Sequence, residues 1–433
     1  MPNNMYKIVL INHTFSQEHM RKRWKMFAEQ HKDIDLYLIA PKEWIAGNQK
    51  QLTFGSPYVY YTAEINEDNY HVVPVDFEYH KLQSWTSKGM VSFIKALKPN
   101  LVYHIGSHLQ DSLMQCFKTV KKLPFCKMVV FSMRGPNHDI LFRGNYSLKT
   151  RLFISLLGTP KVKKVNKYSD AIMCHYPDAV KSFQKEGYKG PIYIQTQVGV
   201  DTEKYKPNVS LRKKIRDKYQ IGNAFLFGSA SRFAADKGVD DILDSLPKTG
   251  NWKYLLMGGG LPEEEQRIKA HIEQLGIRDK VIMTGYIAQS EMNEYWNALD
   301  CAVHIPRTAK SSNWIETFSV ALVQAMATNI PVIGDTSGSV PYQIGPNGII
   351  VREGNIAEIN EKMEWVMTHS SESKMIGDAM RWRAVNCFSI QHLDDCIYDI
   401  FIDVINGIYD KKKYDMAEYK VPSNPYGMER IIQ

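Results

Sequence analysis

The chain has 433 residues, of which 44% are hydrophobic and 23% charged, and its lysines and arginines exceed its aspartates and glutamates by 54 − 46 = 8. This length predicts two domains, because single hydrophobic cores rarely grow beyond about 250–300 residues. The modest positive excess suits an anionic ligand or an anionic membrane face, and no nucleic-acid-binding motif accompanies it. No apolar run approaches the roughly 20 residues that cross a bilayer, and the first residues lack a signal-peptide pattern. We therefore expect a cytoplasmic protein that binds no nucleic acid.

The cysteines and the acidic pairs give no sign of a metal site. Six cysteines are scattered without a Cys-x-x-Cys pair, several of them in apolar patterns, which favours buried free thiols over disulfides or metal ligands. Asp33 and Asp35 have the Asp-x-Asp spacing of some metal sites, but they stand beside a predicted strand and we interpret them as a solvated turn. Asp394 and Asp395 are expected at the exposed start of a helix.

Two series of short apolar runs alternate with helical stretches, which is typical of parallel sheets with crossover helices. The first series predicts strands at residues 8–11, 36–40, 72–75, 101–105, 128–132, 171–174 and 192–195. The second predicts strands at 225–229, 254–257, 281–285, 301–305, 331–334 and 348–351. A turn-rich connection at 197–207 separates them, and a long helix is expected at 393–408. We predict domains over residues 1–198 and 199–391, followed by a last segment, 392–433.

Residues 314–334 are the most informative stretch, because they read as an acidic loop, a helix start and a buried strand. Glu316 precedes the helix, which is expected to begin near Phe318 and Ser319. The first turn of a helix directs unpaired N–H groups and partial positive charge at whatever lies before it, and a diphosphate suits such a place.

Two cations stand on the loop after the first strand of the second domain. Arg232 and Lys237 are five residues apart there, and together they could clamp a diphosphate. The alternative is a pair of solvated surface cations. Further glycine-bearing turns follow the next two strands. One contains Gly259, and the other leads into Tyr286 and Ile287.

These motifs resemble the donor-sugar site of retaining GT-B glycosyltransferases of family 4. In that family a Glu, a small residue, Phe and Gly or Ser open a helix, and a second Glu follows the first by eight positions. Here the second position is Gln324. Arg232 and Lys237 match the family's Gly-Arg-x-x-x-x-Lys-Gly pattern, with Ser231 in place of the first Gly. The resemblance extends over most of residues 1–410, strongly in the second domain and loosely in the first.

The resemblance implies an α/β protein with the GT-B fold, in which two Rossmann-like doubly wound domains face a cleft and the C-terminal helix crosses back to the first domain. It implies a retaining glycosyltransferase that moves a sugar from a nucleotide diphosphate sugar, a UDP-sugar by family frequency, to a hydroxyl acceptor without a metal or other cofactor. The leaving diphosphate would help to deprotonate the attacking hydroxyl. Catalytic candidates are then Glu316, Arg232, Lys237 and His138, and donor-binding candidates are Thr317, Phe318, Ser319, Gln324, Gly259, Tyr286, Ile287 and Arg134.

The first domain departs from the family pattern. The usual Gly-Gly loop after the opening strand is replaced by residues 12–17, Asn-His-Thr-Phe-Ser-Gln. Arg134 and His138 follow a later strand, and either could touch the transferred sugar or the acceptor, which would be a glycan, a lipid-linked molecule or a small molecule. This departure and Gln324 leave open a catalytically inactive GT-B-like protein that binds a nucleotide or glycan. A sugar-nucleotide epimerase is a third alternative, whereas the glycine spacing disfavours a nicotinamide dehydrogenase.

Segments 20–27 and 149–164 mix basic residues with aromatic or apolar ones. Such helices can lie on an anionic membrane surface, which would give peripheral contact with the inner membrane face. They are equally typical of surface helices with one buried stripe.

Overall fold

The structure of the protein is a computed structural model, and it describes residues 5–46, 58–80, 84–133, 147–308, 314–410, 422 and 425. The described chain forms two compact units. Of the described residues, the first unit contains those up to Gln195 and again residues 394–410, and the second contains those from Thr196 to Leu393 together with residues 422 and 425. The sequence placed the corresponding boundaries after residues 198 and 391.

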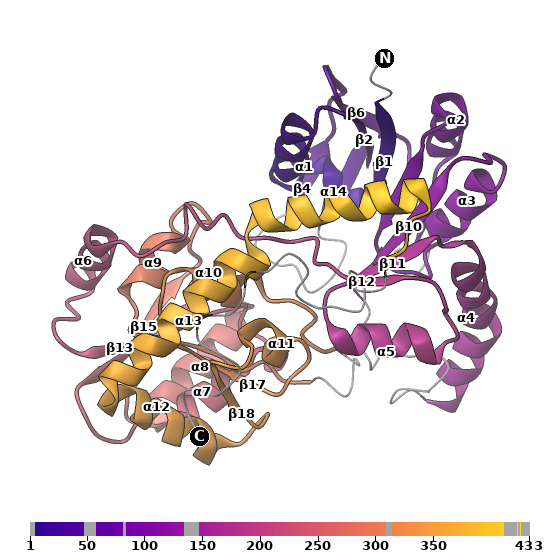
Figure 1. Ribbon diagram of the computed structural model, residues 1–433. Helices are drawn as coiled ribbons and strands as arrows, with labels where there is room; N and C mark the ends of the chain where they lie inside the picture. Colours follow the sequence, from indigo (N-terminus) through magenta and orange to yellow (C-terminus); the bar gives the residue numbers. More distant parts are fainter. Residues whose placement is uncertain are drawn as a thin grey trace. The chain divides into compact units, whose positions relative to one another are not determined.

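The first unit is built on an eight-stranded sheet (Figure 1). Its strands are β1 (Tyr6–Ile11), β2 (Ile34–Pro41), β5 (Ile65–Glu67), β6 (Tyr70–Val75), β9 (Leu101–Ile105), β10 (Lys127–Ser132), β11 (Ala171–Cys174) and β12 (Ile192–Ile194). Their order is β12-β11-β10-β9-β1-β2-β6-β5, and all neighbours are parallel except β5 and β6. Four consecutive residues of β1, Ile8 to Ile11, are fully buried, as expected for a central strand covered on both faces.

Helices cover this sheet, and one of them comes from the far end of the chain. The helical elements are η1 (His13–Ser16), α1 (Glu18–Gln30), α2 (Lys88–Leu97), α3 (Asp111–Val120), α4 (Leu148–Tyr168), α5 (Pro177–Lys185) and α14 (Ile390–Asn406). Helix α14, yellow in Figure 1, buries Ile397, Phe401 and Val404 at helical spacing in the same core as Phe27 and Tyr103. The ring centroids of Tyr103 and Phe401 are 5.2 Å apart.

The expectation that Asp394 lies at an exposed helix start is wrong. Its side chain is 2% exposed and forms a 2.7 Å ion pair with Arg23 of α1. Burial raises the pKa of the Asp394 carboxyl, while the Arg23 charge opposes that rise. Sequence spacing alone could not indicate this pairing, because the two residues are 371 positions apart.

Two short antiparallel hairpins in the first unit were not predicted. One pairs β3 (Glu43–Ala46) with β4 (Tyr58–Tyr61), and the other pairs β7 (Glu78–Tyr79) with β8 (Trp85–Thr86). The hairpins follow the carboxyl ends of β2 and β6, so they stand at one edge of the parallel sheet.

The second unit holds a six-stranded parallel sheet. Its strands are β13 (Phe225–Ala230), β14 (Trp252–Met257), β15 (Val281–Gly285), β16 (Cys301–His304), β17 (Val332–Asp335) and β18 (Ile349–Val351), in the order β15-β14-β13-β16-β17-β18. The helical elements are α6 (Val209–Lys218), η4 (Ala235–Lys237), α7 (Val239–Ser245), α8 (Pro262–Gln274), α9 (Met292–Ala298), α10 (Val320–Ala327), α11 (Val340–Ile344), α12 (Ile356–Thr368) and α13 (Ser370–Phe388). The strand order reverses between β13 and β16, and ligands of such sheets bind at the carboxyl ends of the strands at this switch point.

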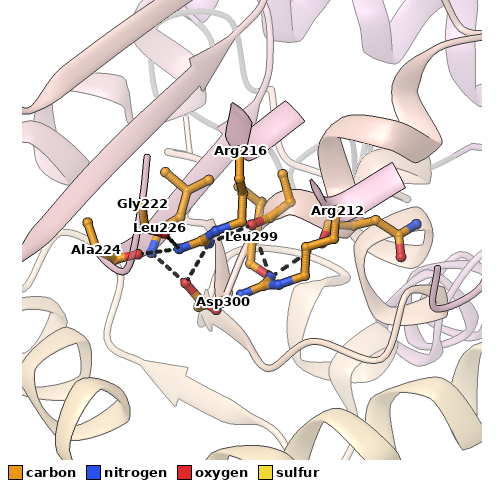
Figure 2. Close-up of polar contacts among 9 residues, drawn as sticks. Arg212, Arg216, Gly222, Ala224, Leu226, Leu299 and Asp300 are labelled. Carbon is orange, nitrogen blue, oxygen red and sulfur yellow. Dashed lines mark hydrogen bonds and ion pairs between the residues drawn. The ribbon is translucent and has the colours of Figure 1, made fainter. Parts of the chain in front are cut away.

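A polar cluster joins β13 and β16 at their other ends, away from the switch point (Figure 2). Asp300, just before β16, accepts a 2.7 Å hydrogen bond from the Leu226 amide of β13 and pairs with Arg212 and Arg216 of α6. Arg212 also donates to the carbonyl of Leu299 at 2.8 Å, so the two arginines satisfy carbonyls at the end of α9. These cations therefore hold helices and strands together on the side away from the switch point.

The predicted strands are confirmed, with end shifts of one or two residues. The helix expected at 393–408 is α14, which begins three residues earlier, at Ile390. The interpretation of the six cysteines as buried free thiols is also confirmed. Among the described residues, no helix is long and apolar enough to cross a membrane.

The basic segment 20–27 is explained by contacts inside the first unit. In α1, Arg21 donates to the carbonyl of Phe15, Arg23 pairs with Asp394, and Lys25 lies 2.7 Å from Glu67. The segment therefore has the buried stripe of an ordinary surface helix.

Candidate functional site

At the switch point of the second unit, the loop after β13 is fastened to the loop after β16. The Arg307 amide donates to the carbonyl of Asp236 at 3.0 Å. Gly238 has φ +67°, and a Cβ there would lie 2.0 Å from the carbonyl oxygen of Ile305. Only glycine permits this close approach. The sequence Lys237-Gly238 thus fixes Lys237 beside the second loop.

Lys237 and Glu316, both predicted site residues, are in contact. The Lys237 Nζ lies 3.2 Å from Glu316 Oε2 and 3.6 Å from Asp236 Oδ2. It also lies 3.8 Å from the ring centroid of Trp314, within range of a cation–π interaction. The structure therefore brings a cation and a carboxylate from separate loops to one place.

The backbone of Glu316 is held from the other side by the turn after β17. The Ser339 amide donates to the Glu316 carbonyl at 2.9 Å. Gly338 has φ +52°, and a Cβ on it would lie 2.0 Å from the same oxygen. Glu316 is consequently fixed by its main chain, and its side chain is directed by Lys237.

Helix α10 begins as predicted, with Ser319 as its N-cap, but one of its amides is already bound. The Ser319 side chain accepts from the Leu322 amide at 3.3 Å. The Ser319 amide donates to Gln343 Oε1, and Gln343 Nε2 donates back to the Ser319 carbonyl, both at 2.9 Å. The Ser319 amide is therefore not available to a ligand. Within the described chain, the first-turn amides without a protein partner are those of Val320 and Ala321.

Gln343 is a residue that the sequence did not single out. It is fully buried in α11 and also accepts from the Ser339 hydroxyl at 3.1 Å. Its only sequence signal is a lone amide side chain in an apolar stretch shortly after the Gly-bearing turn that ends β17. That signal is too common to identify a functional residue.

Gln324 lies on the second turn of α10 and is 4% exposed. Its Oε1 accepts from the Trp296 indole at 3.3 Å. The side-chain NH₂ of Gln324 forms no hydrogen bond with any described residue, and it can donate to a ligand.

The other helix-start residues differ in exposure. The Phe318 ring packs on the core of the second unit, with its centroid 5.7 Å from that of Phe388. Thr317 is half-buried beside Glu316. Arg232 is exposed, and its side chain forms no hydrogen bond or ion pair with any described residue.

The two glycine-bearing turns lie at increasing distance from the switch point. Gly259 follows β14, is buried, and accepts from the Phe233 amide at 2.8 Å, which supports the loop that carries Arg232. Tyr286 and Ile287 follow the edge strand β15, and β14 separates that strand from β13. Tyr286 is 72% exposed, whereas Ile287 packs in the core. The structure does not bring these two together with Lys237 and Glu316. Arg134 and His138 lie outside the described residues.

Two titratable groups beside the site were also not singled out. Burial and the nearby charge of Lys237 lower the pKa of His304, at the end of β16, to about 3. Burial raises the pKa of Asp335, at the end of β17, to about 8. Both side chains are consequently neutral at pH 7. Among the described residues, no group of three or more His, Cys, Asp or Glu side chains is arranged to hold a metal ion.

The second unit contains the part of the chain that matches a known family. Residues 212–382 match the family model described as Glycosyl transferases group 1. A GDP-mannose-dependent alpha-(1-6)-phosphatidylinositol monomannoside mannosyltransferase of Mycobacterium tuberculosis is 25% identical over 189 residues, 42% of this chain and 49% of that protein. An MMP alpha-(1->4)-mannosyltransferase of Mycolicibacterium hassiacum is 28% identical over 204 residues, 45% of this chain and 44% of that protein. The chain thus spans about half the length of the curated relatives that it matches.

Solved structures resemble nearly the whole chain in fold. HepE of Anabaena, in complex with UDP, aligns with a TM-score of 0.65 and 16% identity, covering 92% of this chain and all of that one. Sucrose-phosphate synthase of Thermosynechococcus elongatus aligns with a TM-score of 0.64 and 12% identity, covering 93% of this chain and all of that one. The expected α/β fold of the GT-B type is thereby confirmed. Residues 212–382, which carry the site built around Lys237 and Glu316, are thus similar to the glycosyl transferases group 1.

Proposed function

We propose that the protein is a glycosyltransferase that moves a sugar from a nucleotide diphosphate sugar to a hydroxyl acceptor. The observation that carries this proposal is the start of α10, where the unpaired amides of Val320 and Ala321 follow closely on Glu316 and its partner Lys237. Unpaired amides and a nearby ammonium group together bind a diphosphate. A carboxylate beside them can accept hydrogen bonds from the hydroxyls of the attached sugar.

In this proposal, the ion pair between Lys237 and Glu316 is rearranged when the donor binds. Lys237 turns from the carboxylate to the diphosphate, and Glu316 turns to the sugar. Arg232, which has no described partner, adds a second positive charge at the leaving group. Two cations and helix amides can neutralise the charge that develops on the diphosphate, so we propose transfer without a metal ion. The freed diphosphate then takes the proton of the attacking hydroxyl on the same face, which retains the anomeric configuration.

For the nucleotide, we propose that Gln324 donates to the ribose and that the base lies toward Tyr286 and Ile287. The sequence favours UDP by family frequency, and Anabaena HepE was solved with UDP. Several relatives are named GDP-mannose-dependent instead. The experiment must therefore include both bases.

Binding of donors to the full-length protein tests the site. We would measure dissociation constants for UDP-, GDP- and ADP-sugars by calorimetry, for the wild type and for Arg232→Ala, Lys237→Ala and Glu316→Gln. Loss of a charge-assisted hydrogen bond should raise the dissociation constant about 10- to 100-fold. Arg278→Ala is a matched control, since Arg278 is an exposed arginine in the same unit, paired with Glu273 away from the switch point.

If no nucleotide sugar binds, the proposal is wrong. If one binds tightly but is never consumed with any of a broad set of acceptors, the chain is the inactive binding protein that the sequence left open. Conversion of a donor without an acceptor would instead indicate an epimerase. Where transfer occurs, the proton coupling at the anomeric carbon of the product decides between retention and inversion.

We include a cytoplasmic location and peripheral membrane contact in the proposal. Leu148, Leu152 and Leu156 are exposed at four-residue spacing along α4, beside the lysines of segment 149–164. Such a stripe can enter an anionic membrane surface. Co-sedimentation with anionic and neutral vesicles tests this contact, and equal recovery with both kinds of vesicle would contradict it. Arg134 and His138 remain proposed contacts of the transferred sugar or the acceptor.

A further inference from the structure

The sheet of the first unit has a switch point of its own, and histidines surround it. The strand order reverses between β1 and β9. His13 follows β1 directly in η1, and His104 and His108 belong to the end of β9 and the turn after it. By the rule that applies to open parallel sheets, the carboxyl ends of β1 and β9 form the place where this unit binds a ligand.

His13 is a neutral group with hydrogen-bonding capacity to spare. Burial lowers its pKa below the ordinary histidine value. None of the described residues forms a hydrogen bond with its ring. The ring is nevertheless held in place, because it forms an edge-type contact with Trp44 of β3 at a centroid distance of 5.3 Å and an interplanar angle of 61°. A fixed neutral imidazole can donate from one nitrogen and accept at the other.

The hairpin of β3 and β4 places a pair of aromatic rings beside His13. Trp44 and Tyr60 are directly opposite each other in the antiparallel register, and their rings stack at 5.7 Å and 24°. The hairpin is anchored to the end of β2, since the Thr62 amide donates to the Lys42 carbonyl at 2.9 Å. Side chains alternate along a strand, so Tyr61 points to the other face, where it is 74% exposed.

The surroundings of this pair are polar. Lys42 and Asp76 form an exposed 3.0 Å ion pair, and Glu43 is exposed next to them. A small aromatic surface with a polar rim suits a ligand that has an apolar ring face and many hydroxyls. A pyranose ring presents C–H groups on its faces and hydroxyls around its edge, whereas an acyl chain needs a longer apolar groove.

We propose that His13, Trp44 and Tyr60 form the acceptor subsite and that the acceptor is a saccharide, whose ring lies against the aromatic pair and whose hydroxyl hydrogen-bonds to His13. This inference rests on the proposed glycosyltransferase function and names the class of molecule that receives the sugar. His13 acts here as a positioning residue for the hydroxyl.

The test measures binding of simple sugars to the full-length protein. Methyl α-glucoside, methyl α-mannoside and methyl β-galactoside would be titrated in saturation-transfer NMR, with octyl phosphate as an apolar, anionic comparator. In Tyr60→Leu, the dissociation constant of the glycoside that binds should rise about threefold to tenfold, as expected for one lost aromatic contact. Tyr61→Leu, which changes the same strand on its other face, should leave that constant unchanged.

A second pair of variants changes His13, so its result does not depend on whether the β3–β4 hairpin keeps its fold. His13→Ala should weaken glycoside binding, and His13→Gln, which keeps a donor and an acceptor, should restore part of it. Donor dissociation constants are measured in parallel for every variant and should stay at the wild-type value. If no nucleotide sugar binds the wild type, the proposed function itself fails. If a donor binds but no glycoside does, if octyl phosphate binds instead, or if the Tyr60 and Tyr61 variants behave alike, the acceptor inference is overturned.

Discussion

Replacing Asp335 by Asn should remove a pH dependence from the stability of the second unit. Asp335 is fully buried, its Oδ1 accepts from the Ser337 amide at 3.0 Å, and its Oδ2 has no partner in the described chain. Burial is the main cause that raises its pKa from 3.8 to about 8; the Glu353 and Asp241 charges add to the rise, whereas the Ser337 amide and Arg307 oppose it. Asparagine has the same shape and keeps the Oδ1 bond, so the variant changes chiefly the titration.

The direction of the pH effect on stability follows from the protonation of Asp335 in the folded and in the unfolded protein. Between pH 3.8 and about 8 the folded protein holds a proton on Asp335 that the unfolded chain releases. Stability from this group is therefore lost as the pH rises through that window, by about 1.4 kcal/mol for each pH unit. From pH 5.5 to pH 7.5, the variant should gain about 2.5 kcal/mol of unfolding free energy relative to the wild type. Histidines such as His304 titrate in both proteins, so their effect cancels in the difference.

Urea unfolding at several pH values would measure this difference. Hydrogen exchange of peptides from β16 to β18 is the readout, so that the second unit is observed by itself. Asp217→Asn, at a largely exposed carboxylate on α6, controls for the loss of a carboxylate as such. A difference between the Asp335 variant and the wild type that stays constant from pH 5.5 to pH 7.5 would refute the reasoning, because it would mean that Asp335 is already ionised in the folded protein at the lower pH.

Three other substitutions test contacts described above. Gln343→Leu leaves the buried amide and carbonyl of Ser319 without partners, so it should lower the free energy of unfolding by about 2–4 kcal/mol and weaken donor binding. Unchanged donor affinity in calorimetry would show that the hydrogen bonds between Gln343 and the start of α10 are only structural. Asp300→Asn removes the shared charge partner of two arginines and should lower the free energy of urea unfolding by about 2–3 kcal/mol. A loss below about 0.5 kcal/mol, which is the scatter of surface substitutions, would contradict that. Arg23→Ala leaves the Asp394 carboxylate buried and unpaired, so it should cost about 3 kcal/mol at pH 7 and less at acidic pH, where the carboxyl is protonated; an equal loss at both pH values, measured by thermal unfolding, would count against the ion pair.

The strands and the start of α10 could be predicted because their signals are local. Runs such as Ile8 to Ile11 are apolar over a strand's length, and the Ser319 cap lies directly at the helix that it begins. The missed features depend on residues far apart in the sequence. Gln343 meets Ser319 across 24 positions, and Asp394 meets Arg23 across 371. The β3–β4 hairpin has strands of four residues each, too short for a clear alternation of polar and apolar side chains.

The position of α14 in the chain has a consequence for synthesis on the ribosome. Ile397, Phe401 and Val404 complete the core around β1, β2 and β9, yet they are made only after all the strands of the second unit. The second unit can therefore close as soon as its own strands have emerged, while the first waits with an apolar sheet face uncovered. Because such faces bind other chains, a nascent protein stalled before residue 390 would be a natural client of chaperones. A fragment ending at Gln195 should for the same reason aggregate when expressed alone.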